Sequence, residues 1–146
     1  GRMPRVRSMS MSSWVGGHDV KHTWFGGPEW RMYRKTGDFV DPGPSMTLVF
    51  IDEREDSIND GFWVTDFNNV TESSLRIIDY PASYHNGAAG ISFADGHAES
   101  WRWVEKNTME TAAKPIPWLV LQPGQRGGDR DLQRLFSAIP QTIPVN

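Results

Sequence analysis

The densest group of chemically capable side chains is an acidic loop that runs from residue 52 to residue 61. Carboxylate oxygens are the ligands that calcium prefers. The loop nevertheless departs from the calcium loop of an EF-hand, because Ile58 stands where that pattern needs an oxygen ligand. A solvated acidic loop and acid–base chemistry by a carboxylate pair are the two alternatives. Calcium ligands would come from Asp52, Glu53, Glu55, Asp56 and Asp60.

Two other patterns touch on catalysis, and both are incomplete. His18 and His22 have the four-residue spacing of zinc ligands on a helix, but glycine pairs on either side favour a loop. The segment around Ser92 partly resembles a nucleophile elbow. It lacks the last glycine of that motif, and a hairpin turn follows it where a helix is required. We therefore predict no catalytic residue, and no cofactor other than the calcium considered above.

The aromatic content allows a binding surface as well as a core. The chain has seven Trp and seven Phe residues, which fill a small core or stack on sugars. Core filling is the ordinary outcome for such side chains. If a stacking surface exists, its candidates are Trp24, Trp30, Trp63, Trp101 and Trp103.

Charge and composition exclude several classes of protein. The net charge is −3, and the only basic run is Arg2, Arg5 and Arg7, so a nucleic-acid partner is not expected. Cysteine is absent, which rules out disulfides and thiolate metal sites. No apolar run approaches the roughly 18 residues that span a bilayer. The 146 residues are of a length typical of one domain, over residues 1–146.

The elements that position these side chains are mostly strands and loops. Residues 1–44 are predicted to form long loops with one or two short strands, and residues 47–52, 61–66 and 75–80 are predicted strands. Leu132, Leu135, Phe136 and Ile139 have helical spacing, with Asp129 as the expected cap and Pro140 as the end. The pattern predicts an α+β fold with a small antiparallel sheet, long loops and few short helices.

The clearest local signal is a hairpin over residues 90–104. Asp95 and Gly96 separate two β-compatible runs, and this dipeptide favours a two-residue type I′ turn. That turn would place Phe93 opposite Ala98, with Ser92, Ala94, His97, Glu99 and Trp101 on one face of the sheet and Ile91, Phe93 and Ala98 on the other.

His85 and Asp95 form a longer pattern: a histidine, nine residues, then Asp95-Gly96. Asn86-Gly87 is a turn signal, and Gly90 to Ala94 would span roughly 17 Å as one strand. The histidine and the aspartate then lie near opposite ends of that strand, too far apart for a catalytic pair. We interpret His85, Asn86, Gly87, Asp95 and Gly96 as structural residues.

This pattern, in the string YHNGAAGISFADGHAESWRW at residues 84–103, resembles the H-X9-DG C-terminal domain of bacterial proteins with a prepilin-type N-terminal signal. Those proteins are similar to the pseudopilins of type II secretion. Further matching stretches lie at residues 6–11, 42–53, 56–61 and 79–85, so the resemblance covers about residues 5–104.

The resemblance implies a pilin-like globular domain and a structural role outside the cytoplasm. It implies an upstream hydrophobic helix, absent from this chain, that anchors the protein in the inner membrane and then packs with other pseudopilin subunits and the secretion machinery. Contact with the membrane is expected only through that helix. Calcium sites in related pseudopilins favour a cation in the acidic loop, and no catalytic residues come with the resemblance. Two alternatives stay open: a carbohydrate-binding module with exposed Trp residues, and a glycoside hydrolase that uses carboxylates such as Glu53 and Glu99.

Overall fold

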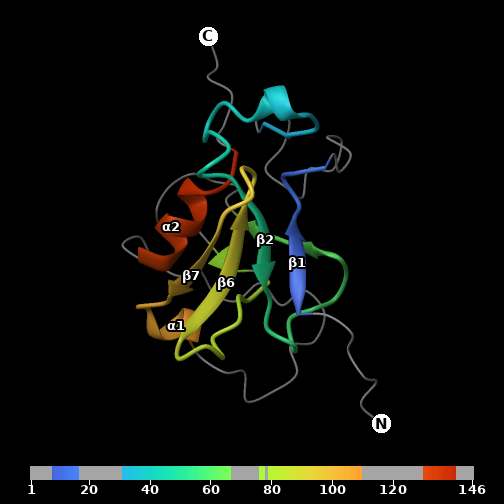
Figure 1. Cartoon of the computed structure of the whole chain (residues 1–146). Helices are drawn as coiled ribbons and strands as arrows, with labels where there is room; N and C mark the ends of the chain where they lie inside the picture. Colours follow the sequence, from blue (N-terminus) through green and yellow to red (C-terminus); the bar gives the residue numbers. More distant parts are fainter. Residues whose placement is uncertain (1–7, 17–30, 67–75, 78, 110–129, 141–146) are drawn as a thin grey trace.

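A computed structural model describes residues 8–16, 31–66, 76–77, 79–109 and 130–140 (Figure 1). Its strands and helices follow one another along the chain, with one turn of 3-10 helix at Thr36–Asp38. They are β1 Met9–Ser12, β2 Leu48–Asp52, β3 Phe62–Trp63, β4 Thr65–Asp66, β5 Arg76–Ile77, β6 Ala88–Phe93, β7 Ala98–Arg102, α1 Lys106–Met109 and α2 Arg130–Ser137. The α+β class is confirmed.

The main sheet has five strands in the order β3-β1-β2-β6-β7, and β4 and β5 form a separate pair. The pairs β1–β2, β2–β6 and β6–β7 are antiparallel, as predicted. Strand β3 departs from the prediction, because it runs parallel to β1. The sheet is therefore mixed, although it is mostly antiparallel.

Local propensity predicts some elements well and others only in part. The strand at Leu48–Asp52 and the helix at Arg130–Ser137 agree with the sequence patterns. The predicted strand at residues 61–66 is divided into β3 and β4, and the one at residues 75–80 is reduced to Arg76–Ile77 among the described residues. The predicted helix cap Asp129, the histidines His18 and His22, and Trp24 and Trp30 lie outside the described residues.

The hairpin forms where it was predicted, but its register is shifted by one residue. Ser92 pairs with Ala98, and the Phe93 N–H donates to the His97 carbonyl at 2.9 Å. The loop therefore has three residues, and only its last one, Gly96, has a positive φ, at 94°. A one-residue slip moves the side chains of one strand to the opposite face. The predicted division of faces is thus wrong, and Phe93 shares a face with His97 and Trp101.

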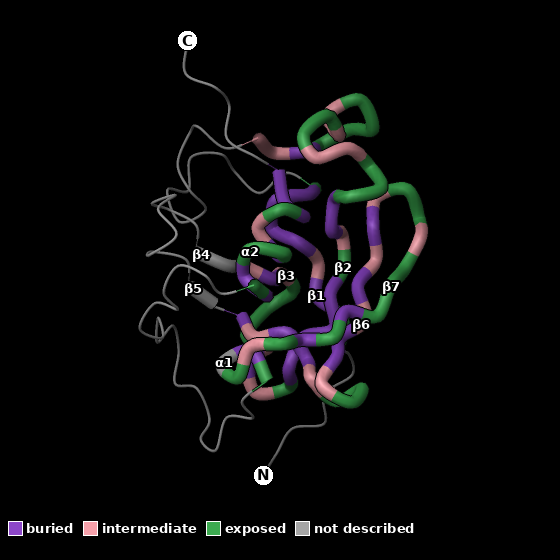
Figure 2. The backbone as a smooth tube through the Cα atoms, turned by 90° about the vertical axis from the view of Figure 1, so that its left-hand side faces the viewer, coloured by how far each residue is buried: buried purple, intermediate pink, exposed green. Residues whose placement is uncertain are grey.

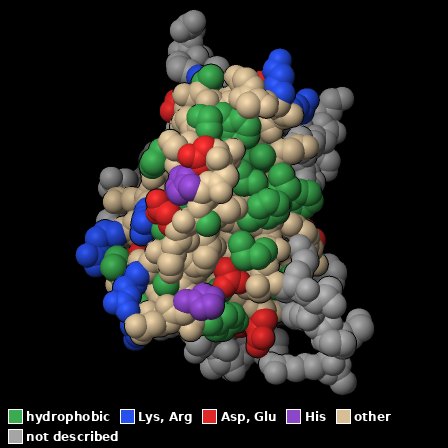
Figure 3. All heavy atoms as spheres, viewed as in Figure 1, with side chains coloured by type: hydrophobic (Ala, Val, Ile, Leu, Met, Phe, Trp, Pro, Cys, Tyr) green, Lys and Arg blue, Asp and Glu red, His purple; other side chains and the backbone are tan. Residues whose placement is uncertain are grey.

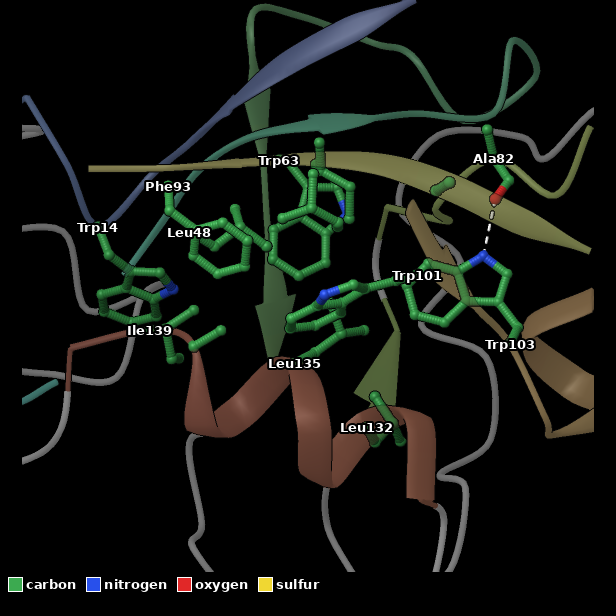
Figure 4. Close-up of a cluster of buried hydrophobic side chains, with 14 residues drawn as sticks. Trp14, Leu48, Trp63, Ala82, Phe93, Trp101, Trp103, Leu132, Leu135 and Ile139 are labelled. Atoms are coloured by element: carbon green, nitrogen blue, oxygen red, sulfur yellow. Dashed lines mark hydrogen bonds between the residues drawn. The ribbon is translucent and has the colours of Figure 1, made fainter. Parts of the chain in front are cut away.

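Helix α2 lies against one face of the sheet, and the core fills the space between them (Figure 2). Leu132, Leu135 and Ile139 follow the helical period and are fully buried against the sheet. Figure 4 shows Trp63 and Trp101 pointing into the same space from the strands. Burial of each large apolar side chain contributes roughly 1.5–3 kcal/mol, so this layer is the main source of stability.

None of the described helices is long and apolar enough to cross a membrane.

Candidate functional site

The first end of the H-x9-D-G pattern is a turn that leads into β6. Asn86 and Gly87 adopt left-handed φ values of 56° and 76°, and the Gly87 N–H donates to the Ser83 carbonyl at 3.0 Å. The preceding His85 is largely exposed, and its Nε2 lies 3.5 Å from Oδ2 of the buried Asp52 at the end of β2. The histidine therefore links the turn before β6 to the neighbouring strand.

The second end is the hairpin tip. One oxygen of Asp95 accepts the His97 N–H at 3.1 Å and lies 2.5 Å from the Nδ1 of the same residue. The hydrogen bond that the His97 side chain donates to Asp95 raises the pKa of His97 and lowers the pKa of Asp95. The imidazole also stacks on Phe93, with ring centroids 4.3 Å apart. These contacts hold the tip in place, and His85 and Asp95 stand before and after β6, as predicted.

A short polar row continues from the tip towards α2. Glu99 Oε1 lies 3.4 Å from His97 Nε2, and Glu99 Oε2 accepts the indole N–H of Trp101 at 2.7 Å. The hydrogen bond from Trp101 lowers the pKa of Glu99, with His97 and Arg134 contributing less. The Arg134 guanidinium lies over the Trp101 ring, 3.8 Å from its centroid. The row thus connects the hairpin to the helix.

The acidic residues of the 52–61 loop point to separate partners. Glu53 is buried and accepts a hydrogen bond from the Ser10 hydroxyl, whereas Asp56 pairs with Arg54 at 2.5 Å. Asp60 accepts the Phe62 N–H at 2.7 Å. Nowhere in the described part of the chain do three His, Cys, Asp or Glu side chains gather as a metal site. Calcium binding by Asp52, Glu53, Glu55, Asp56 and Asp60 stays a prediction.

A further buried carboxylate, Asp79, was missed by the sequence analysis. Its side chain accepts the Val64 N–H at 2.7 Å, and its carbonyl accepts the indole N–H of Trp63 at 2.9 Å. Burial, assisted by the negative charge of Glu53, raises the pKa of Asp79 to about 8. The residue therefore holds a proton at neutral pH. An aspartate after a β-compatible run is an ordinary loop signal, so the sequence contained nothing to mark it.

The predicted stacking surface is wrong for three of its five tryptophans. Trp63, Trp101 and Trp103 are 0%, 3% and 2% exposed. The indole N–H of Trp103 donates to the Ala82 carbonyl at 2.8 Å, inside the core (Figure 4). These rings face α2 and the interior, because the sheet turns its apolar side towards the helix. They cannot stack on a sugar at the surface.

The face of the main sheet turned away from α2, called here the open face, is not covered by any described helix. Figure 3 looks onto this face and shows hydrophobic side chains gathered over β1 and β2, with smaller and polar groups over β6 and β7. Met9 and Phe50 are 40% and 42% exposed there. Exposed apolar side chains that lie side by side are a feature of contact surfaces.

Comparison of this chain with protein-family models, with curated proteins and with solved structures finds no match.

Proposed function

We propose that this chain is the globular domain of a pseudopilin-like structural subunit, which takes part in an extracytoplasmic fibre related to type II secretion. The observation that carries the proposal is how the H-x9-D-G residues are used. His85 links a turn to Asp52, and Asp95 holds the hairpin tip through His97. Both ends of the pattern stabilise β6, and this use fits the resemblance to a family whose globular domain works by packing and display.

The contacts of the candidate catalytic carboxylates favour a protein without enzymatic activity. Of the carboxylates considered for glycoside hydrolysis, Glu53 is buried and bonded to Ser10, while Glu99 is bonded to Trp101. Glu53 directly follows β2 and Glu99 lies on β7, and β6 separates these two strands, which are therefore about 10 Å apart. With three of the five candidate tryptophans buried, no specific observation favours carbohydrate binding either.

In the proposed subunit an upstream apolar helix anchors the protein in the inner membrane and later packs with the helices of other subunits. The globular domain then lies outside the cytoplasm. A subunit that works by packing needs uncovered apolar surface, and the exposed Met9 and Phe50 supply it. Calcium in the acidic loop belongs to the same proposal.

The test is expression of the complete reading frame in a bacterium with and without a prepilin peptidase. We expect a membrane-bound precursor that is shortened only when the peptidase is present, and a mature form that enters sheared surface fibres. A variant altered at the cleavage position is the matched control and should stay at precursor size. A reading frame with no apolar segment upstream, or a protein that the peptidase leaves intact, would refute the proposal.

A further inference from the structure

The turn before β6 holds the only Asn-Gly pair of the sequence, Asn86-Gly87. Asparagine is a chemically labile residue, and a following glycine increases the lability because no side chain shields its backbone nitrogen. Asn86 is exposed, and within the described part of the chain its side chain has no hydrogen-bond partner. The amide group of Asn86 is therefore open to its neighbour's nitrogen and to water.

We propose that Asn86 is a site of spontaneous deamidation, and that the turn before β6 controls its rate. The Gly87 nitrogen attacks Cγ of Asn86, a bond forms between these two atoms, and the Cγ–Nδ2 bond breaks. Nδ2 leaves as ammonia, which takes up the proton that the Gly87 nitrogen loses. Water then opens the resulting succinimide ring at one of its two carbonyl carbons, which gives aspartate or isoaspartate. The chain and water supply every atom of this reaction.

The closed turn restrains this reaction in two ways. Asn86 has a φ of 56°, in the left-handed region, whereas the ring closes only after the next peptide unit has rotated towards the asparagine side chain. The Gly87 N–H also donates to the Ser83 carbonyl at 3.0 Å, which keeps the attacking nitrogen occupied. Both restraints are lost together when the turn opens. Exposed turns open locally without unfolding of the whole domain, so the deamidation rate reports how often this turn opens.

Contacts on either side of the turn determine how often it opens. The Trp103 N–H donates to the Gly87 carbonyl at 2.8 Å, and the His85 N–H donates to the Ala88 carbonyl at 3.4 Å. The His85 side chain adds the contact with Asp52, where Nε2 and Oδ2 are 3.5 Å apart. Only this last contact depends on side chains, so a substitution can remove it and leave the backbone bonds in place. Its loss should make the turn open more often and so accelerate deamidation.

Two related pairs in the sequence, Asp60-Gly61 and Asp95-Gly96, are internal comparisons. An ionised carboxylate resists attack by nitrogen, because its charge repels the incoming electron pair and its oxygen is a poor leaving group. Each aspartate also accepts a backbone N–H, from Phe62 at 2.7 Å and from His97 at 3.1 Å. The hydrogen bond from the His97 side chain lowers the pKa of Asp95 and keeps that carboxylate ionised. Succinimide formation is therefore concentrated at Asn86.

Conversion to isoaspartate would disrupt the first end of the H-x9-D-G pattern. In isoaspartate the main chain runs through the former side chain, which adds one methylene group to the backbone before Gly87. The left-handed geometry at residue 86 and the two hydrogen bonds of Gly87, with Ser83 and Trp103, cannot all survive this insertion. Strand β6 then loses the turn that starts it. Because ammonia is released, the change is not reversed. This inference does not depend on the proposed function.

Peptide mapping by mass spectrometry tests the proposal on the purified chain, incubated at neutral pH both folded and in guanidinium chloride. We expect the mass gain of deamidation in the peptide that contains residue 86, with aspartate and isoaspartate both present. The rate should be lower in the folded protein by about tenfold or more, because the reaction there waits for local opening. Equal rates in the two samples would overturn the proposal. So would a folded protein that gains no mass at residue 86, or a denatured chain modified first at another residue.

Variants separate control by the turn from the chemistry itself. His85→Gln removes the contact with Asp52 from its exposed side, and it should speed deamidation of the folded protein severalfold while leaving the rate in guanidinium chloride unchanged. Asp52→Asn removes the same contact from the other side and should act alike. Glu99→Gln on β7, which has no contact with the turn, is the matched control and should keep both wild-type rates. Wild-type rates for folded His85→Gln and Asp52→Asn would refute control by the turn.

The modified protein tests the structural consequence. Ion exchange separates the deamidated fractions, since each has gained one negative charge. The isoaspartate fraction should unfold at a lower urea concentration than the unmodified chain, and the aspartate fraction should lie closer to the unmodified chain. Equal urea midpoints for the isoaspartate fraction and the unmodified chain would show that the turn tolerates the longer backbone, against the proposed disruption.

Discussion

Replacement of Asp79 by asparagine should change how the stability of the domain depends on pH. The side chain is 3% exposed, and burial with the charge of Glu53 raises its pKa from 3.8 to about 8. A raised pKa in the folded state gives stability that is complete below the unfolded pKa and is lost as pH rises through the folded pKa. For Asp79 this loss covers the window from about pH 4 to about pH 8.

The magnitude follows from one proton. In that window the folded protein holds the proton and the unfolded chain does not, so the free energy of unfolding falls by about 1.4 kcal/mol per pH unit. Between about pH 5 and about pH 7 the loss of stability from Asp79 alone is roughly 3 kcal/mol. Asparagine resembles the protonated side chain, since it has no charge and keeps an oxygen that can accept the Val64 N–H.

The assay is urea unfolding of wild type and Asp79→Asn at several pH values across this window, monitored by tryptophan fluorescence. We expect the free energy of unfolding of the variant, relative to that of the wild type, to rise by roughly 3 kcal/mol from about pH 5 to about pH 7. Glu55→Gln, which removes an exposed carboxylate from the acidic loop, is the control and should keep the wild-type slope. If Asp79→Asn and wild type run parallel across the window, the buried carboxylate does not hold a proton and the reasoning is refuted.

Three further predictions test the hairpin and its connection to α2. Gly96→Ala should lower the free energy of unfolding by about 1–2 kcal/mol through backbone strain alone, since φ is +94° and an added Cβ meets nothing within 4 Å. Gly37→Ala, where the added Cβ also meets nothing but φ is not positive, should be near neutral in the same urea assay. Equal effects of the two substitutions would contradict the turn geometry. Asp131→Ala should destabilise the protein by about 2–4 kcal/mol, because the buried carboxylate accepts the N–H groups of Val104 at 3.0 Å and Glu105 at 2.9 Å. Asp131→Asn should lose less stability. An alanine variant as stable as the wild type would disprove that Asp131 ties α2 to the end of the hairpin. Asp95→Asn should lower the pKa of His97 measured by NMR titration, since Asp95 is the main cause of its rise; an unchanged His97 pKa would show that the pair does not form in solution.

The hairpin shows how far sequence pattern reaches. Asp95-Gly96 between β-compatible runs places the turn correctly, because turn chemistry is local. Turn chemistry does not fix the number of loop residues, since two-residue and three-residue loops both accept Asp followed by Gly. The three-residue loop was decided by the buried side chains: Ile91, Phe93 and Trp101 all face the core in the observed register. The predicted register would have put Trp101 on the opposite face from Phe93.

The candidate site was predictable as a set of residues but not as a set of contacts. The spacing of His85 and Asp95 correctly indicates two ends of one strand. The partner of His85 is Asp52, 33 positions earlier. The raised pKa of Asp79 depends first on its burial and then on the charge of Glu53, which is distant in sequence. The aromatic count was equally consistent with a stacking surface and a core, and only the side of the sheet on which α2 packs separates the two for Trp63, Trp101 and Trp103.

By itself the sequence determined the α+β class and the positions of β2, the hairpin and α2, because propensity, period and turn chemistry act between neighbours in the chain. The tertiary structure alone decided the parallel pairing of β3 with β1, the register at Phe93 and His97, and the burial of Asp79 and Asp131. Each of these depends on residues that are distant in sequence and meet only after the sheet and α2 have packed. Packing against α2 excludes water from one face of the sheet, and the contacts in that layer form only when distant parts of the chain meet.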